Sequence, residues 1–177
     1  MGAPYPTSLA ERIIRDLFPI RFKASSHSGL VNDPRAIRRD KLPPMAHSLE
    51  ATIRAAYAAF GRGDIDGYLQ PCAEDFAFHV PGYGGIAGTY VGRDGLYDLA
   101  GKAMAITGGT FSEEVEDVLV NDSHAVVLAR HRFTRDDSLK DYRTAHVYEI
   151  SEGKLSRCFE QPRDPASFDD AWGSSQV

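Results

Sequence analysis

The dominant hydrophobic period of this chain changes near residue 110. Before that point, over residues 48–60, 64–69 and 94–106, the apolar positions recur every three to four residues, which is typical of amphipathic helices. From Thr110 onward apolar and polar residues alternate, which predicts strands. The alternating runs lie near 110–120, 124–135, 141–151 and 154–162. The turn sequences between them are Asn121-Asp122, Asp136-Asp137 and Glu152-Gly153. Helices followed by an antiparallel meander predict an α+β fold, in which a curved sheet wraps the helices and encloses a cone.

Three helices are predicted ahead of the meander. Ser48 is expected to cap the first helix, and Gly61 follows its end. Asp64 opens a short second helix. Asp94 is expected to cap the third helix, which runs to about Ile106.

Residues 1–44 differ from the rest in composition. They hold eight Lys and Arg against four Asp and Glu, in a polar, turn-rich sequence that is typical of an extension. One short helix is predicted within them, over residues 7–18. We therefore expect an N-terminal extension over 1–44 and one folded domain over 45–177. A native start at Met45 is a further hypothesis, because Met45 leads directly into the first strong helix.

The composition excludes several classes of partner. The net charge is −5, and no basic run with interleaved aromatic residues occurs, so nucleic acid is not expected. No apolar run approaches the roughly 20 residues of a membrane-spanning helix, and charged residues interrupt the apolar positions near the N-terminus. Cys72 and Cys158 lack CxxC spacing and predict buried, reduced thiols. We expect a cytoplasmic protein without membrane contact.

A lone histidine marks an early strand over residues 75–80. Phe76 and Phe78 share one face of this strand, and His79 lies on the other. A glycine-rich loop over 82–88 follows, and it lacks the spacing of a phosphate-binding loop. We expect this loop to act as a mobile lid over an apolar pocket, with Tyr83 and Ile86 as the side chains that close on a ligand.

Four stretches of sequence carry a family resemblance. They are Phe78-His79-Val80-Pro81-Gly82, Ala87-Gly88-Thr89-Tyr90-Val91-Gly92-Arg93, Ala145-His146-Val147-Tyr148 and the terminal Asp164…Phe168-Asp169…Trp172. In this order they resemble the SnoaL-like branch of the nuclear transport factor 2-like (NTF2-like) superfamily, over about residues 48–172. That superfamily includes ketosteroid isomerases, polyketide cyclases, epoxide hydrolases and dehydratases, and also members that only bind or dimerise. The resemblance implies a conical pocket and a homodimer paired through the convex face of the sheet, and it leaves the reaction open.

Three candidate catalytic residues follow from the resemblance: His79, His146 and Asp164. A histidine titrates near neutral pH, so His79 is expected to be the main acid or base, with His146 in support. The matching strand of ketosteroid isomerases carries an aspartate, so His79 argues against steroid isomerisation. The alternatives are structural: His79 bonded to a neighbouring strand, and Asp164 capping or bracing the C-terminal segment.

Six further residues are expected to contact the substrate. They are Tyr57, Phe78, Tyr83, Ile86, Tyr148 and Glu160. Ketosteroid isomerases place a catalytic tyrosine on the first helix, where this chain has Tyr57, although a tyrosine on an apolar stripe is more often a core residue. Glu160 is the second candidate carboxylate after Asp164.

The consecutive residues Arg130, His131 and Arg132 lie on one predicted strand. Alternation sends His131 to one face and both arginines to the other. Pairing with Asp141 or Glu149 on the neighbouring strand is the expected explanation of the arginines.

Two functional hypotheses remain open. The first is a cofactor-independent acid/base enzyme, of isomerase, cyclase or dehydratase type, acting on a small hydrophobic carbonyl- or hydroxyl-bearing molecule. The second is a non-catalytic ligand-binding or dimerisation module. Two histidines without a third ligand do not predict a metal site, and no cofactor is expected. The hypotheses differ in whether His79, His146 and Asp164 converge on one cavity.

Overall fold

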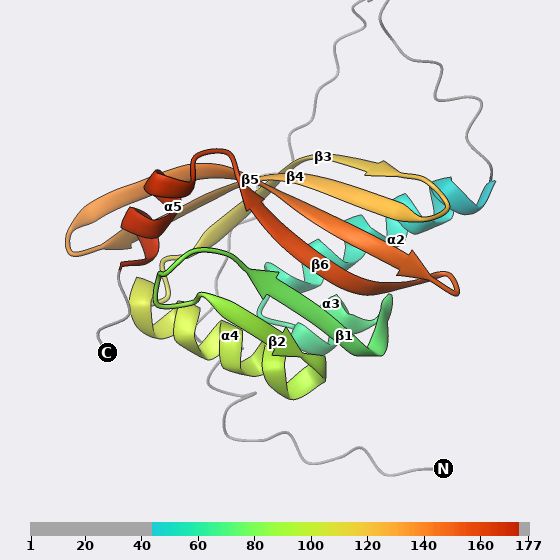
Figure 1. Ribbon diagram of the computed structural model, residues 1–177, viewed down its shortest axis with the longest axis horizontal. Coiled ribbons are helices and arrows are strands. Elements are labelled where there is room, and N and C mark those ends of the chain that lie inside the picture. Colours follow the sequence, from blue (N-terminus) through green and yellow to red (C-terminus); the bar gives the residue numbers. More distant parts are fainter. Residues whose placement is uncertain (1–43, 174–177) are drawn as a thin grey trace, which may run out of the picture.

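A computed structural model describes residues 44–173 of the chain. Four helices and six strands follow one another along this part of the chain (Figure 1). Their bounds are α2 Pro44–Phe60, α3 Ile65–Leu69, β1 Cys72–Val80, β2 Gly88–Val91, α4 Gly92–Thr107, β3 Ser112–Val120, β4 His124–Arg135, β5 Ser138–Ser151, β6 Lys154–Pro162 and α5 Pro165–Trp172.

The six strands form one mixed sheet with the order β2-β1-β6-β5-β4-β3. Strands β3 to β6 pair antiparallel in sequence order, so the predicted meander is confirmed. The early strand β1 joins the sheet parallel to β6 and antiparallel to β2. One mixed sheet together with the helices that precede the meander makes an α+β fold, so the α+β prediction is confirmed.

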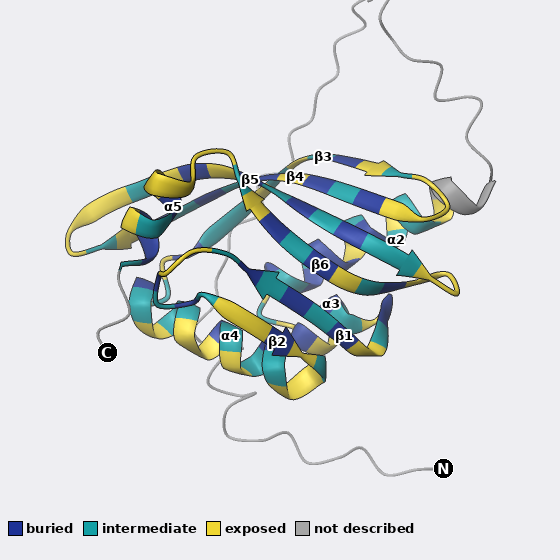
Figure 2. Cartoon of the chain, viewed as in Figure 1, coloured by how far each residue is buried: buried dark blue, intermediate teal, exposed yellow. Residues whose placement is uncertain are grey.

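The core lies between the concave face of the sheet and helices α2, α3 and α4 (Figure 2). Buried and less buried residues alternate along β4 and β5, as the period of two requires. Along the second half of β1 the buried side chains are those of Phe76, Phe78 and Val80, while His79 on the opposite face is partly exposed. The alternation of the sequence thus decides which side chains enter the cone.

The helix starts differ from the prediction. Helix α2 begins at Pro44, so Ser48 lies inside the helix and does not cap it. A proline suits the first turn because its missing N–H has no partner there. Helix α4 begins at Gly92, directly after β2, and Val91 precedes it without a side-chain cap. Asp94 therefore lies in the first turn, where its charge still favours the helix dipole.

Two elements were not predicted, namely strand β2 and helix α5. The end of the glycine-rich stretch pairs with β1 as β2, with His79 opposite Thr89. The rest of that loop is attached to α5, because the Tyr83 backbone N–H donates to Asp169 Oδ1 at 2.9 Å and the Gly85 N–H donates to the Trp172 carbonyl at 3.3 Å. The loop is thus fixed at two points.

Several other predictions can be placed. Cys72 and Cys158 are free and buried, as expected. No helix in the part of the chain that the structure describes is long and apolar enough to cross a membrane. The predicted helix over residues 7–18 and the proposed start at Met45 lie outside what the structure can test, because residues 1–43 are not described. The boundary between extension and domain stays a prediction.

Candidate functional site

A cavity of about 70 Å³ lies inside the cone. Its walls are mainly apolar and come from helices α2, α3 and α4, from the sheet, and from the loop after β1; Phe60, Val80, Ile86, Leu96 and Ala100 are among them. At one end the lining becomes polar. An apolar pocket with a few convergent polar groups is the usual form of a small-molecule site.

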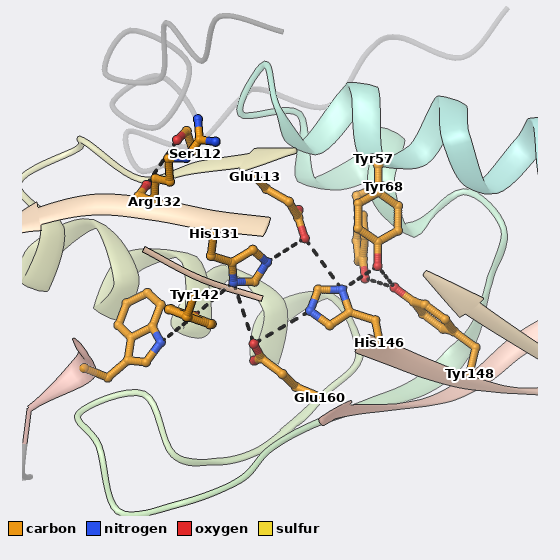
Figure 3. Close-up of polar contacts among 11 residues, drawn as sticks. Tyr57, Tyr68, Ser112, Glu113, His131, Arg132, Tyr142, His146, Tyr148 and Glu160 are labelled. Carbon is orange, nitrogen blue, oxygen red and sulfur yellow. Dashed lines mark hydrogen bonds and ion pairs between the residues drawn. The ribbon is translucent and has the colours of Figure 1, made fainter. Parts of the chain in front are cut away.

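The polar end is built from one side chain on each of four consecutive strands (Figure 3). They are Glu113 on β3, His131 on β4, His146 on β5 and Glu160 on β6. The register makes Glu113 the cross-strand partner of His131, and His146 the partner of Glu160. We call these four residues the His/Glu cluster.

Small residues separate the two pairs. On the same face, the row between them contains Ala129 opposite Thr144. The imidazoles of His131 and His146 approach one another over this row, and their ring centroids are 5.4 Å apart. All four side chains of the cluster are nine-tenths or more buried. Two carboxylates and two imidazoles thus meet in an apolar interior.

His131 is held at both ring nitrogens. Its Nε2 lies 2.8 Å from Glu113 Oε1, and its Nδ1 lies 2.9 Å from the Tyr142 hydroxyl. The Trp172 indole N–H donates to the same hydroxyl at 2.7 Å. If the Tyr142 proton goes to Nδ1, then Nε2–H donates to Glu113, and every donor in this chain has an acceptor.

His146 is held at one nitrogen only. Its Nδ1 lies 2.6 Å from the Tyr57 hydroxyl, which lies 2.6 Å from the Tyr148 hydroxyl; that oxygen lies 2.8 Å from the Tyr68 hydroxyl. With the Tyr57 hydroxyl donating to Nδ1, the neutral imidazole carries its proton on Nε2, and the charged imidazole carries protons on both nitrogens.

Three buried polar atoms in the described chain have no hydrogen-bond partner. They are Thr144 Oγ1, His146 Nε2 and Glu160 Oε1. His146 Nε2 and Glu160 Oε1 face one another at 3.8 Å, which is longer than a hydrogen bond. Buried polar groups are nearly always paired, and His146 and Glu160 both line the cavity, so these two unpaired atoms indicate a place where a ligand completes the bonding.

The charges of the cluster shift the pKa values of Glu113 and His146. Burial alone would raise the pKa of Glu113, but the positive charge of His131, its hydrogen bond and the charge of His146 together lower it below the ordinary value. Burial alone would lower the pKa of His146, but the facing Glu160 and the nearby Glu113 raise it above the ordinary value. Burial raises the pKa of Tyr57, Tyr68 and Tyr148 well above 10.0, so these phenols are neutral at pH 7.

Known proteins share this architecture. The family model described as "SnoaL-like domain" matches residues 53–158. The chain belongs to the SnoaL-like family. The matched segment contains Glu113, His131 and His146, whereas Glu160 lies two residues beyond it.

Relatives of this SnoaL-like protein are found among curated sequences and solved structures. The uncharacterised protein Rv0034 of Mycobacterium tuberculosis (strain H37Rv) is 33% identical over 121 residues, which cover 68% of this chain and 92% of that one. The structure of Bal32a, from a soil-derived mobile gene cassette, is 28% identical and covers 73% of this chain and 99% of its own, with a TM-score of 0.67. An NTF2-like protein of unknown function from Burkholderia pseudomallei K96243 is 22% identical and covers 70% and 96%, with a TM-score of 0.62. The NTF2-like fold is thereby confirmed.

The structure does not bring the three predicted catalytic residues of this SnoaL-like protein together. His79 lies on the convex side of β1, where its Nδ1 is 2.8 Å from Thr89 Oγ1 and its ring stacks on Phe159 at 4.7 Å. Only His146 lines the cavity. The physical reason is the parity of β1, because Phe78 and Val80 occupy the face that enters the cone.

Asp164 lies at the exit of β6 and is exposed. It caps helix α5: its carboxylate accepts from the Ala166 N–H at 3.1 Å and from the Ser167 hydroxyl at 2.6 Å. The Ser167 hydroxyl and the backbone N–H groups lower the pKa of Asp164 below its ordinary value. The capping alternative for Asp164 is therefore what the structure shows, and its catalytic role stays a prediction.

Four of the six predicted substrate-contacting residues line the cavity, namely Tyr57, Phe78, Ile86 and Glu160. Tyr148 lies behind Tyr57 and is fully buried. Tyr83 points away from the core and is 84% exposed. The cavity is thus lined both by inner-face residues, which alternation could identify, and by Ile86, which comes from the loop.

Sequence reasoning missed Glu113 and His131 as functional residues. His131 alternates in phase with Ala129 and Phe133, which are both buried, and this pattern is a usable signal. Arg130 pairs with Asp141, as expected, on the other face. Glu113 stands beside Glu114 and near Glu116, so composition alone could not separate the buried carboxylate from the exposed ones.

Proposed function

We propose that this SnoaL-like protein is an enzyme that performs acid/base chemistry on a small, largely apolar molecule bearing a carbonyl or hydroxyl group. The observation that carries the proposal is the pair His146 Nε2 and Glu160 Oε1. These two atoms are buried, lack hydrogen-bond partners within the described chain, and face one another at 3.8 Å at the end of an apolar cavity. One is a donor and the other an acceptor.

The two groups have complementary roles in this proposal. His146 Nε2–H donates to the carbonyl oxygen of the substrate and stabilises the negative charge that develops there. Glu160 removes a proton from the adjacent carbon or hydroxyl and returns it at a second position. Such a proton transfer underlies isomerisation, intramolecular cyclisation and loss of water alike. The apolar walls exclude solvent and strengthen both interactions.

The remaining cluster residues position this pair. The tyrosine chain that ends at Tyr57 fixes the orientation of the His146 ring through Nδ1. The contact of His131 with Glu113 holds a second carboxylate next to that ring, at 3.6 Å from His146 Nδ1. A hydrogen-bond donor whose ring is held in this way stabilises the developing charge without reorganisation at the moment of reaction.

The test compares the wild-type protein with a Glu160→Gln variant against a library of hydrophobic carbonyl and hydroxyl compounds. Native mass spectrometry identifies retained compounds, and chromatography of the released compounds detects conversion. Wild type is expected to convert at least one compound. Glu160→Gln is expected to retain it with turnover lowered by about 10²- to 10⁴-fold, which is the usual contribution of a general base.

Glu149→Gln is the matched control, because Glu149 is partly exposed and faces Arg157 on the sheet surface. It is expected to turn over like wild type. Equal turnover by wild type and Glu160→Gln would remove Glu160 from the mechanism. Retention without conversion by the wild-type protein would instead support the alternative, a non-catalytic ligand-binding or dimerisation module.

The role of His79, the homodimer and the cytoplasmic location are further proposals. A His79→Ala variant in the same assay tests the predicted role of His79, for which the convex position offers no contact with the cavity. Homodimer formation is proposed from the family, and a cytoplasmic location is proposed from the composition. The reaction itself is independent of both.

A further inference from the structure

We infer that the His/Glu cluster binds a divalent transition-metal ion, with Glu113, His131 and His146 as its protein ligands. The site is assembled at the end of the cavity by strands β3, β4 and β5. Two imidazoles and one carboxylate are a common ligand set for zinc in catalytic sites and for other divalent first-row metals. The inference does not depend on the reaction proposed above.

The three candidate ligand atoms lie within 4.8 Å of one another. Glu113 Oε1 is 2.8 Å from His131 Nε2 and 3.6 Å from His146 Nδ1. In a tetrahedral zinc site with bonds of about 2.1 Å, neighbouring ligand atoms are roughly 3.4 Å apart. The two separations from Glu113 Oε1 lie on both sides of that value, so metal binding requires the three side chains to rotate toward a common centre.

The opposite ring nitrogens also have the partners that metal-binding histidines use. Glu160 Oε1 lies 3.7 Å from His131 Nδ1 and 3.8 Å from His146 Nε2. A carboxylate behind a ligating histidine orients the ring and raises its basicity. Here one carboxylate faces both rings, and the Tyr142 hydroxyl also contacts His131 Nδ1. Tyr57 keeps Tyr148 as a partner when the metal takes His146 Nδ1.

Charge balance supports the same inference. Two ionised carboxylates beside two neutral imidazoles would leave two negative charges in an apolar interior, which is costly. Two protons or one divalent cation can neutralise them. The cation uses the imidazoles in their neutral, ligating form.

The sequence alone predicted no metal because it offered two histidines and no third ligand. Those two histidines were His79 and His146, and the structure separates them. Cross-strand register replaces His79 with His131 and adds Glu113. The ligand set thus comes from the folded sheet and from no continuous motif.

The experiment measures metal content and affinity on the full-length chain. The protein is stripped with a chelator, dialysed against Zn²⁺ and exchanged into metal-free buffer, and bound zinc is measured by inductively coupled plasma mass spectrometry. We expect one equivalent per chain. Competition with a chromophoric chelator should show affinity lowered by about 100-fold or more in Glu113→Gln and in His131→Ala. In Glu160→Gln, which alters the supporting carboxylate, the loss should be about 10- to 100-fold.

His124→Ala is the matched control for His131→Ala, because His124 also lies on β4 but is exposed at the start of the strand. It should bind zinc like wild type. A second measurement needs no variant: anomalous scattering from wild-type crystals grown with Zn²⁺ should place the ion between Glu113, His131 and His146. This keeps the test decisive if a substitution prevents folding.

Three results would overturn the inference: no zinc retained by wild type, zinc retained equally by Glu113→Gln and His131→Ala, or an anomalous peak elsewhere. The outcome is separable from that of the proposed reaction. Turnover by chelator-stripped protein would uphold the acid/base proposal without metal, whereas zinc bound without turnover would uphold the metal site alone.

Discussion

Thr144 places a buried hydroxyl in the row between the two halves of the His/Glu cluster. The side chain is 4% exposed, and its Oγ1 has no hydrogen-bond partner in the described chain. Removing a buried polar group that makes no bond relieves a desolvation cost. Thr144→Val is therefore expected to raise the free energy of unfolding by about 1 kcal/mol in the ligand-free protein, measured by denaturant titration.

Thr107 is the matched comparison, because it is equally buried but donates to the Ala103 carbonyl at 2.8 Å. Thr107→Val loses that bond and should destabilise the protein by about 1 kcal/mol. The two identical substitutions thus have opposite predicted signs. A destabilised Thr144→Val would mean that this hydroxyl already has a partner, such as a bound water, and that it does not await a ligand.

Single residues show where sequence reasoning succeeds and where it fails. Alternation gives the phase of a strand, and this correctly put Phe78 and His79 on opposite faces and separated His131 from Arg130 and Arg132. Phase does not say which face enters the cone. The family pattern then favoured His79, whereas the buried phase of its strand belongs to Phe76 and Phe78. Glu113 depended on pairing with β4, which no local pattern reveals.

At the scale of elements, helix α5 depends on its cap at Asp164. The carboxylate accepts from two groups in the first turn, and its pKa is lowered below the ordinary value of 3.8. Asp164→Ala should lower the thermal unfolding midpoint by a few degrees at neutral pH, measured by circular dichroism, because a first-turn N–H loses its acceptor. Since the folded-state pKa is depressed, the difference from wild type should be present above the unfolded-state pKa and vanish as the pH falls through the folded-state value.

Turnover of Asp164→Ala separates the two interpretations of this residue. The capping account predicts turnover close to wild type at a temperature well below the midpoint, because the carboxylate is exposed and does not line the cavity. Loss of turnover with an unchanged midpoint would instead establish the catalytic role that the family resemblance implies.

Elements with a strong period were predictable, and short ones were not. Strands β4 and β6 have the bounds that alternation predicted, and β5 begins three residues earlier, at Ser138. The turn before it uses positive φ at Asp136 and Asp137, which aspartate tolerates. Strand β2 has only four residues and depends on pairing with β1, so the sequence pattern did not predict it as a strand. The predicted starts placed caps at Ser48 and Asp94, whereas α2 begins earlier, at Pro44, and α4 begins at Gly92 without a side-chain cap.

At the scale of the whole molecule, the site is a product of topology. Four consecutive strands each contribute one polar residue, and helices α2 and α3 contribute the tyrosines that hold His146. The meander brings Glu113 and Glu160, which are far apart in the sequence, to the same end of one cavity. The resemblance to SnoaL-like proteins predicted the cone. Which polar residues lie inside it depends on the strand register, which the sequence alone did not show.

The central claim is that the buried His/Glu cluster is where this protein meets its ligand. The most direct measurement is a crystal structure of wild-type protein with a compound that native mass spectrometry shows to be retained. The account predicts an oxygen of that compound within about 3 Å of His146 Nε2 or Glu160 Oε1, with the apolar part against Phe78 and Ile86. A compound bound beside His79 on the convex face, with the cluster unchanged, would contradict it.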